Sequence, residues 1–403
     1  MEKINKYSSY KDSGIEWIGE IPSHWEVKKI KYSMSLIMGQ SPNSDDCNSD
    51  GEGMPFLQGN ADFGLINPLP QNWCKNPTKI APHNSVLLSV RAPIGAVNIA
   101  NVDYCVGRGL CALISDNTKF TYYASVCLYD ELNSLGTGST FKAISTEQIL
   151  NTFIALPPKS EQTAIAAFLD RKTAEIDQLI ADKKQLLELY REEKTAIINK
   201  AVTKGINPDA KMKESGIEWL GEIPEHWEVK RLKYVAYFQR GHDLPSTSFV
   251  EGSVPVYGSN GIIGYHNENT GFGPSIIVGR SGSVGEVNFV PESMFWAHNT
   301  SLFLLKGFGN DINYLYYLLK ILDLKSYAAG TAVGTLNRNN IHEIKVAIPE
   351  LEEQKSIVEF IETKSKTIDA KIARTEKLIE LLTEYRTTLI SEVVTGKVKV
   401  VDN

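Results

Sequence analysis

The sequence contains few cysteines, no long apolar run and no strong excess of either charge. Its five cysteines form no CxxC pair, so we expect neither a disulfide framework nor a zinc site, and a reducing cytoplasm is the simplest location. No run of 18 apolar residues predicts a membrane span, and residues 1–14 lack the apolar core of a signal peptide. The net charge of −6 excludes a chain that binds polyanions through bulk positive charge alone, but a local basic groove remains compatible with it.

Motifs of catalysis are also missing. The seven histidines form no HxH or HExxH group, and the sequence has no GxSxG motif. Residues 279–285 are rich in glycine, yet they match neither the P-loop pattern nor the dinucleotide pattern GxGxxG. We therefore expect no metal site and no catalytic site in this chain.

A long internal duplication organises the 403 residues. Residues 13–32 read SGIEWIGEIPSHWEVKKIKY and residues 215–234 read SGIEWLGEIPEHWEVKRLKY, which is identity at 16 of 20 positions. Later matches follow in the same order, with an offset that falls from 202 to 192. We expect the surplus of the first half to lie in the polar stretch 41–53, which has the composition of a loop.

Each half divides into a globular part and a helical part. Short apolar runs such as 86–90 and 275–278 lie between turn residues and predict strands, whereas 314–322 predicts a helix. We expect an α+β fold with two tandem globular domains, each followed by a long helix, related by an internal pseudo-twofold duplication. The predicted boundaries are 1–158 for the first domain, 159–207 for its helix, 208–349 for the second domain and 350–403 for its helix.

The two long helices carry matching apolar seams. Apolar positions recur every three or four residues, and prolines and glycines mark where each helix starts and ends. A lone helix with one apolar seam is unstable in water, so we expect the two helices to pair as an antiparallel coiled coil. The predicted seam residues are Leu169, Ile176, Ile180, Leu187, Tyr190, Ile197, Ile361, Ile368, Ile372, Ile379, Leu382 and Leu389.

The duplicated segment 13–32 contains aromatic and basic residues with two possible roles. Its tryptophans favour packing of the incoming chain against the domain and a helix end. The basic runs 28–31 and 230–233 fit a phosphate-facing cluster and a solvated strand edge equally well. In the glycine-rich turn, we align Arg91 with Arg280. Such an arginine can reach a guanine or a phosphate, and it can equally pair with an internal carboxylate.

The chain resembles the specificity subunits of type I restriction-modification systems over essentially its whole length. The resemblance rests on residues 15–22 (IEWIGEIP) and their copy, 156–162 (LPPKSEQ) and their copy, 201–205 (AVTKG) and 278–285 (VGRSGSVG). It implies a non-catalytic DNA-recognition subunit. Each globular part would be a target recognition domain for one half of a bipartite double-stranded DNA sequence. The helices would set the spacing and dock two methyltransferase (modification) subunits.

The resemblance also implies where the chemistry lies. S-adenosylmethionine, ATP and magnesium are expected on partner subunits only, with restriction/translocase subunits in the full complex and no membrane. Loop positions in both domains become candidate DNA contacts: Arg91, Lys142, Arg240, His242, Ser259, Asn260, Arg280, Ser281, Asn299 and Arg338. Two other functions remain open from the residues alone. One is a non-catalytic scaffold or adaptor that binds protein or RNA through its duplicated modules, and the other is an enzyme with a site that no motif reveals.

Overall fold

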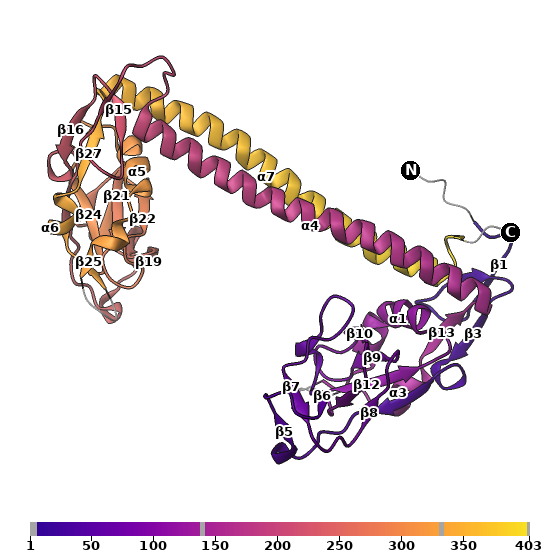
Figure 1. Cartoon of the computed structure of the whole chain (residues 1–403). Coiled ribbons are helices and arrows are strands. Elements are labelled where there is room, and N and C mark those ends of the chain that lie inside the picture. Colours follow the sequence, from indigo (N-terminus) through magenta and orange to yellow (C-terminus); the bar gives the residue numbers. More distant parts are fainter. Residues whose placement is uncertain (1–5, 138–141, 330–333, 401–403) are drawn as a thin grey trace. The chain divides into compact units, whose positions relative to one another are not determined.

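The computed structural model describes residues 6–137, 142–329 and 334–400 (Figure 1). By its contacts, the chain forms two compact units. The first contains Met1–Lys184 and Lys377–Asn403, and the second contains Gln185–Glu376. Each unit therefore contains one globular domain and a part of each long helix. All five cysteines are free thiols.

The first unit contains an α+β domain built on two sheets. The antiparallel sheet has the order β10-β9-β12-β4, and a second sheet has the order β5-β7-β6-β11-β8, in which only β6 and β11 are parallel. The strands are β1 Tyr10–Asp12, β2 Glu20–Pro22, β3 Glu26–Lys29, β4 Ser35–Met38, β5 Cys47–Asn48, β6 Met54–Leu57, β7 Asn72–Cys74, β8 Ile80–Ala81, β9 Val86–Ser89, β10 Val97–Ile99, β11 Tyr104–Val106, β12 Leu110–Ile114 and β13 Phe153–Leu156. The helices are α1 Thr118–Cys127, α2 Tyr129–Leu135, α3 Thr146–Asn151 and the long α4 Lys159–Lys204.

The second unit repeats this plan. Its two larger sheets have the orders β17-β24-β21-β22 and β19-β18-β23-β20, and β14-β15, β16-β27 and β25-β26 form two-stranded sheets. The strands are β14 Met212–Glu214, β15 Glu222–Pro224, β16 Glu228–Arg231, β17 Tyr237–Arg240, β18 Val254–Gly258, β19 Gly261–His266, β20 Gly271–Phe272, β21 Ser275–Gly279, β22 Val287–Val290, β23 Met294–Ala297, β24 Ser301–Lys306, β25 Ala328–Ala329, β26 Thr335–Leu336 and β27 Lys345–Ile348. The helices are α5 Ile312–Ile321, α6 Arg338–His342 and the long α7 Leu351–Val394.

The predicted α+β class and duplication are confirmed, but the expected position of the extra residues is wrong. Most of the surplus lies between β6 and β7, where residues 58–71 replace the two-residue turn Ser259–Asn260 between β18 and β19. The stretch 41–53 is only slightly longer than its counterpart, and it carries a strand of its own. That strand, β5, pairs with β7.

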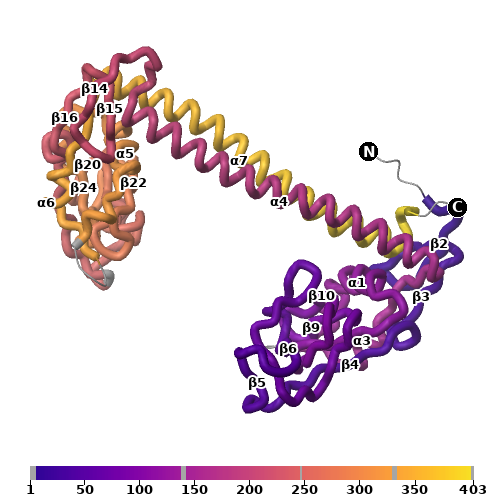
Figure 2. Tube along the Cα trace, viewed as in Figure 1, coloured from indigo at the N-terminus to yellow at the C-terminus, as the bar shows by residue number. Residues whose placement is uncertain are grey.

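The long helices begin where the sequence predicts, but they end at Lys204 and Val394, short of the predicted bounds 207 and 403. Prolines precede α4 and α7, and Gly205 and Gly396 follow them with positive φ angles of 73° and 76°. In both units α4 and α7 lie side by side, so the predicted helix pairing is confirmed (Figure 2). Six of the predicted seam residues are buried and the other six are partly buried.

An equivalent salt bridge joins the helices in each unit. In the first unit, Arg386 donates to both oxygens of Asp177, at 2.8 and 3.1 Å. In the second unit, Lys194 donates to both oxygens of Asp369, each at 2.8 Å. Asp369 follows Asp177 by 192 residues, and Arg386 follows Lys194 by 192, so the duplication reproduces the contact with its partners exchanged between helices.

The duplicated lead-in segment has a structural role. Trp25 is fully buried and donates to Glu161 at the start of α4, at 3.0 Å. Trp227 does the same to Glu353 at the start of α7, at 3.2 Å. A Cβ atom at Gly396 would overlap Pro22, so the end of α7 also packs closely on this segment. The predicted packing of the incoming chain against the domain and a helix end is therefore found.

Candidate nucleic-acid interface

A polar pocket of about 690 Å³ lies in the second domain, at the ends of β17 and β21. It brings together four of the ten predicted DNA contacts. Its lining residues are Gln239, Arg240, Gly241, His242, Asp243, Arg280, Leu302, Thr335, Asn337 and Arg338. Three arginines and one aspartate leave the pocket with a positive charge, which suits phosphate groups and the acceptor atoms of guanine.

The backbone holds Arg280 firmly at the pocket wall. Its N–H donates to the carbonyl of Thr300 at 2.8 Å, and its carbonyl accepts the N–H of Leu336 at 2.8 Å. Among the described residues, the guanidinium donates to one acceptor, the carbonyl oxygen of Asn299 at 3.3 Å. A side chain with a fixed backbone and N–H groups to spare is preorganised to bind a further acceptor.

The other two arginines are weakly engaged. Arg240 lies 3.4 Å from Asp243, whose side chain is exposed and also accepts a hydrogen bond from Asn299. Arg338 makes no hydrogen bond or ion pair with any described residue through its guanidinium. These two cations are therefore available to a ligand in the pocket.

The buried His342 links two elements that carry pocket residues. Burial, together with the charges of Arg338 and Lys233, lowers the pKa of His342 below its usual value. The neutral ring can then accept the N–H of Phe238 through Nε2 at 3.0 Å. This bond ties α6, which carries Arg338, to β17, which carries Arg240.

The remaining predicted residues of the second domain surround the pocket without lining it. Ser281 continues the turn after Arg280 and donates its N–H to the carbonyl of Thr300 at 3.1 Å. Ser259 packs against the same turn, because a Cβ atom at Gly279 would lie 2.8 Å from its carbonyl oxygen. Asn260 is exposed at the tip of its two-residue turn.

In the first domain, the structure corrects our alignment of Arg91 with Arg280. Val90 accepts the N–H of Ile144 at 3.0 Å, as Arg280 accepts that of Leu336, so Val90 is the true counterpart of Arg280. Val90 is buried, whereas Arg91 is exposed one residue further on. The structure does bring Arg91 beside Lys142, since the N–H of Ala92 donates to the carbonyl of Lys142 at 3.2 Å.

The first domain therefore carries different chemistry at the equivalent strand ends. Strand register places Met38 at the position of Arg240 and Thr146 at that of Arg338. Besides Arg91 and Lys142, these strand ends carry a third cation, Arg108, which the sequence analysis did not identify. Arg108 occupies the position of Asn299. The N–H of Arg108 points to Ser41 Oγ at 3.4 Å. An alignment in strand register would have found it.

The described part of the chain contains neither a metal-binding cluster nor a membrane-spanning helix. No group of three or more His, Cys, Asp or Glu side chains is arranged to hold a metal ion within residues 6–137, 142–329 and 334–400. No helix among these residues is long and apolar enough to cross a membrane.

Comparison with known proteins decides the family. The sequence model described as "Type I restriction modification DNA specificity domain" matches residues 22–189 and again 224–381. The chain belongs to this family. Both globular domains are thus DNA specificity domains of the type I restriction-modification kind, and the resemblance read from the residues is confirmed.

Relatives agree with this assignment, and a solved structure agrees with the fold. The MjaX specificity subunit of Methanocaldococcus jannaschii is 40% identical over 207 residues, which cover 50% of this chain and 47% of that protein. The MjaIX specificity subunit of the same organism is 25% identical over 441 residues, which cover 99% of both chains. A solved chain from a type I R-M system is similar in fold, with a TM-score of 0.70 and 14% identity, covering 93% of this chain and 98% of that one.

Proposed function

We propose that this chain is the specificity subunit of a type I restriction-modification complex, in which each globular domain reads one half of a bipartite double-stranded DNA target. The observation that carries the proposal is the pair of specificity domains with unlike side chains at equivalent strand ends. Two copies of one scaffold with different reading residues suit two different half-sites.

In this proposal the long helices set the distance between half-sites and dock two methyltransferase subunits. A row of exposed apolar side chains on α7 supports docking. Leu378, Leu381 and Tyr385 are 39%, 48% and 55% exposed and follow one another at spacings of three and four residues. Such a row lies on one face of a helix and suits an apolar helix of a partner.

The cofactors belong to the partners in this proposal. Methyltransferase subunits would bind S-adenosylmethionine, and restriction/translocase subunits would bind ATP and magnesium. This chain would supply DNA recognition and hold the assembly together, without a catalytic group of its own.

The test is to express the chain with its modification subunit in cells that lack other type I systems and to sequence the methylated bases. A new methylated motif with two fixed blocks and a gap is expected. The purified complex should bind that duplex with an affinity that falls steeply with salt, because phosphate contacts release counterions. Tighter binding of RNA, or binding without any methylated motif, would favour the adaptor function instead.

A further inference from the structure

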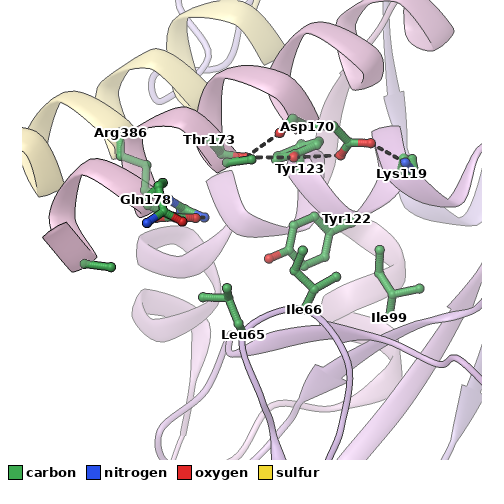
Figure 3. Close-up of a pocket in the computed structure, with 13 residues that line it drawn as sticks. Leu65, Ile66, Ile99, Lys119, Tyr122, Tyr123, Asp170, Thr173, Gln178 and Arg386 are labelled. Atoms are coloured by element: carbon green, nitrogen blue, oxygen red, sulfur yellow. Dashed lines mark hydrogen bonds and ion pairs between the residues drawn. The ribbon is translucent and has the colours of Figure 1, made fainter.

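The first unit contains a groove of about 420 Å³ whose wall includes Leu65 and Ile66 of the loop 58–71 (Figure 3). Leu65 and Ile66 from this loop, Tyr122 from α1 and Asp170 from α4 lie around the groove, and Figure 3 shows them approaching it from different elements. Lys119 at its rim is paired with Asp170. Leu65 and Ile66 thus give the groove an apolar wall, and Lys119 is already paired with a carboxylate.

The loop is fixed to the edge of β10. The N–H of Ile99 donates to the carbonyl of Ile66 at 2.7 Å. The buried amide of Asn98 donates to the carbonyl of Gly64 at 3.0 Å and accepts the N–H of Gly64 at 3.2 Å. Residues 63–67 therefore form hydrogen bonds with the outer edge of β10, as an additional strand would.

Within the described residues, the second unit has no counterpart of this loop, because only the two-residue turn 259–260 joins β18 to β19. Strand register makes Asn288 and Phe289 of β22 the counterparts of Asn98 and Ile99. Asn288 Nδ2 is buried and has no hydrogen-bond partner among the described residues. Outside its own sheet, no described residue bonds to the backbone of Phe289. A buried donor without an acceptor is costly, so this position calls for an acceptor from elsewhere.

The groove beside β22 is correspondingly more open. It measures about 620 Å³ and is lined by Tyr316, Tyr317 and Ile321 of α5 together with residues of α4 and α7. The groove adjoins the edge strand β22, because the ring of Phe289 in this strand lies 5.8 Å from the ring of Tyr316 in the groove wall. Lys320, also at the rim, lies over the Tyr316 ring rather than beside a carboxylate.

Charge at this groove favours an acidic occupant. Lys194 is paired with Asp369. Lys320 and Lys366 form no ion pair with any described residue. Three lysines face two carboxylates, Glu362 and Asp369. In the first groove, by contrast, the cations Lys119 and Arg386 are both ion-paired.

We propose that an extended segment of a modification subunit occupies, in the second unit, the place that residues 63–67 hold in the first. Its backbone would accept from Phe289 N–H and from Asn288 Nδ2, as the backbone at Ile66 and Gly64 does in the first unit. An aliphatic side chain would enter the groove beside Tyr316, and a neighbouring carboxylate would pair with Lys320 and Lys366. This inference rests on the proposed function, because it assigns the segment to that partner.

The test measures hydrogen exchange of individual amides in the full chain, alone and assembled with the modification subunit. Alone, the Phe289 amide should exchange quickly and the Ile99 amide slowly, because only Ile99 is bonded to a loop. On assembly, Phe289 should slow by at least about tenfold, the factor expected for a new hydrogen bond, while Ile99 stays unchanged.

A charge-reversal variant tests the occupant's chemistry. Lys320→Glu with Lys366→Glu should weaken assembly by about tenfold or more. The matched control, Lys213→Glu with Lys345→Glu, changes two exposed lysines of the same unit outside the groove and should leave assembly unchanged. Melting curves of both variants establish that the chain still folds.

The possible outcomes separate this inference from the function on which it rests. A complex with both modification subunits bound in which Phe289 exchanges as fast as before would overturn the inference and leave the function standing. Protection of Phe289 that rises with the concentration of this chain alone would assign the edge to a second copy and also overturn it. Failure of the two proteins to assemble at all would refute the proposed function, and the inference with it.

Discussion

The same substitution at two equivalent asparagines should change stability in opposite directions. Asn98 forms three hydrogen bonds, two with Gly64 and one with the carbonyl of Val97, and it is 1% exposed. Asn98→Leu removes these bonds and leaves the Gly64 backbone groups without partners, so it should destabilise the first unit by about 2–4 kcal/mol. Asn288→Leu instead removes a buried donor that has no partner among the described residues, and should stabilise the second unit by about 1 kcal/mol.

The assay must resolve the two units, because a chain with two cooperative units does not give one well-defined unfolding free energy. Native-state hydrogen exchange of core amides does so, with Leu88 reporting on the first unit and Val278 on the second. These residues occupy equivalent positions in β9 and β21. If both substitutions destabilise their units to a similar extent, the reasoning about covered and uncovered edge strands is refuted.

Three further predictions concern charged and titrating groups. Arg386→Ala leaves the partly buried Asp177 without its partner and should cost about 1–2 kcal/mol in melts of the first unit; an unchanged melt would show the ion pair to be incidental. His342 has a lowered pKa in the folded chain, so the stability it contributes is complete above the unfolded value of about 6.5 and is lost as the pH falls. Urea denaturation of the second unit from pH 7.5 to 5 should show this loss, and His342→Gln should reduce the dependence on pH. Arg280→Ala should weaken DNA binding by about 1–3 kcal/mol and relax one base position if it contacts guanine, whereas a phosphate contact gives a uniform loss in competition assays.

Long-range sequence patterns predicted the architecture well. The duplication, the seams and the proline and glycine boundaries are local or periodic features, and they fix the helices directly. Pro157 and Gly205, for example, bracket α4 in both the sequence and the structure. The role of Trp25 and Trp227 also followed from the sequence, because a repeated segment rich in aromatic residues has to be buried against something.

The candidate interface was predicted less completely, because it depends on strand register and on contacts through space. Arg91 and Arg280 looked equivalent in a gapped alignment, yet a slip of one residue places Val90 at the position of Arg280. Arg108 was missed because nothing near it in sequence resembles Asn299. The polarity of 41–53 suggested an inserted loop. In the structure this stretch contains β5, which pairs with β7 so that Cys47 lies opposite Cys74.

Exchanging one globular domain for the other shows whether each domain reads its own half-site. Residues 33–156 are replaced by residues 235–348, keeping both lead-in segments and both long helices, and the methylated bases of cells that carry this chimaera and its modification subunit are sequenced. With the same reader twice on helices that pair in antiparallel fashion, the methylated target should be a palindrome in which the second half-site is repeated in inverted orientation. If a folded, partner-bound chimaera keeps the original asymmetric target or gains a direct repeat, the two domains do not each read one half-site.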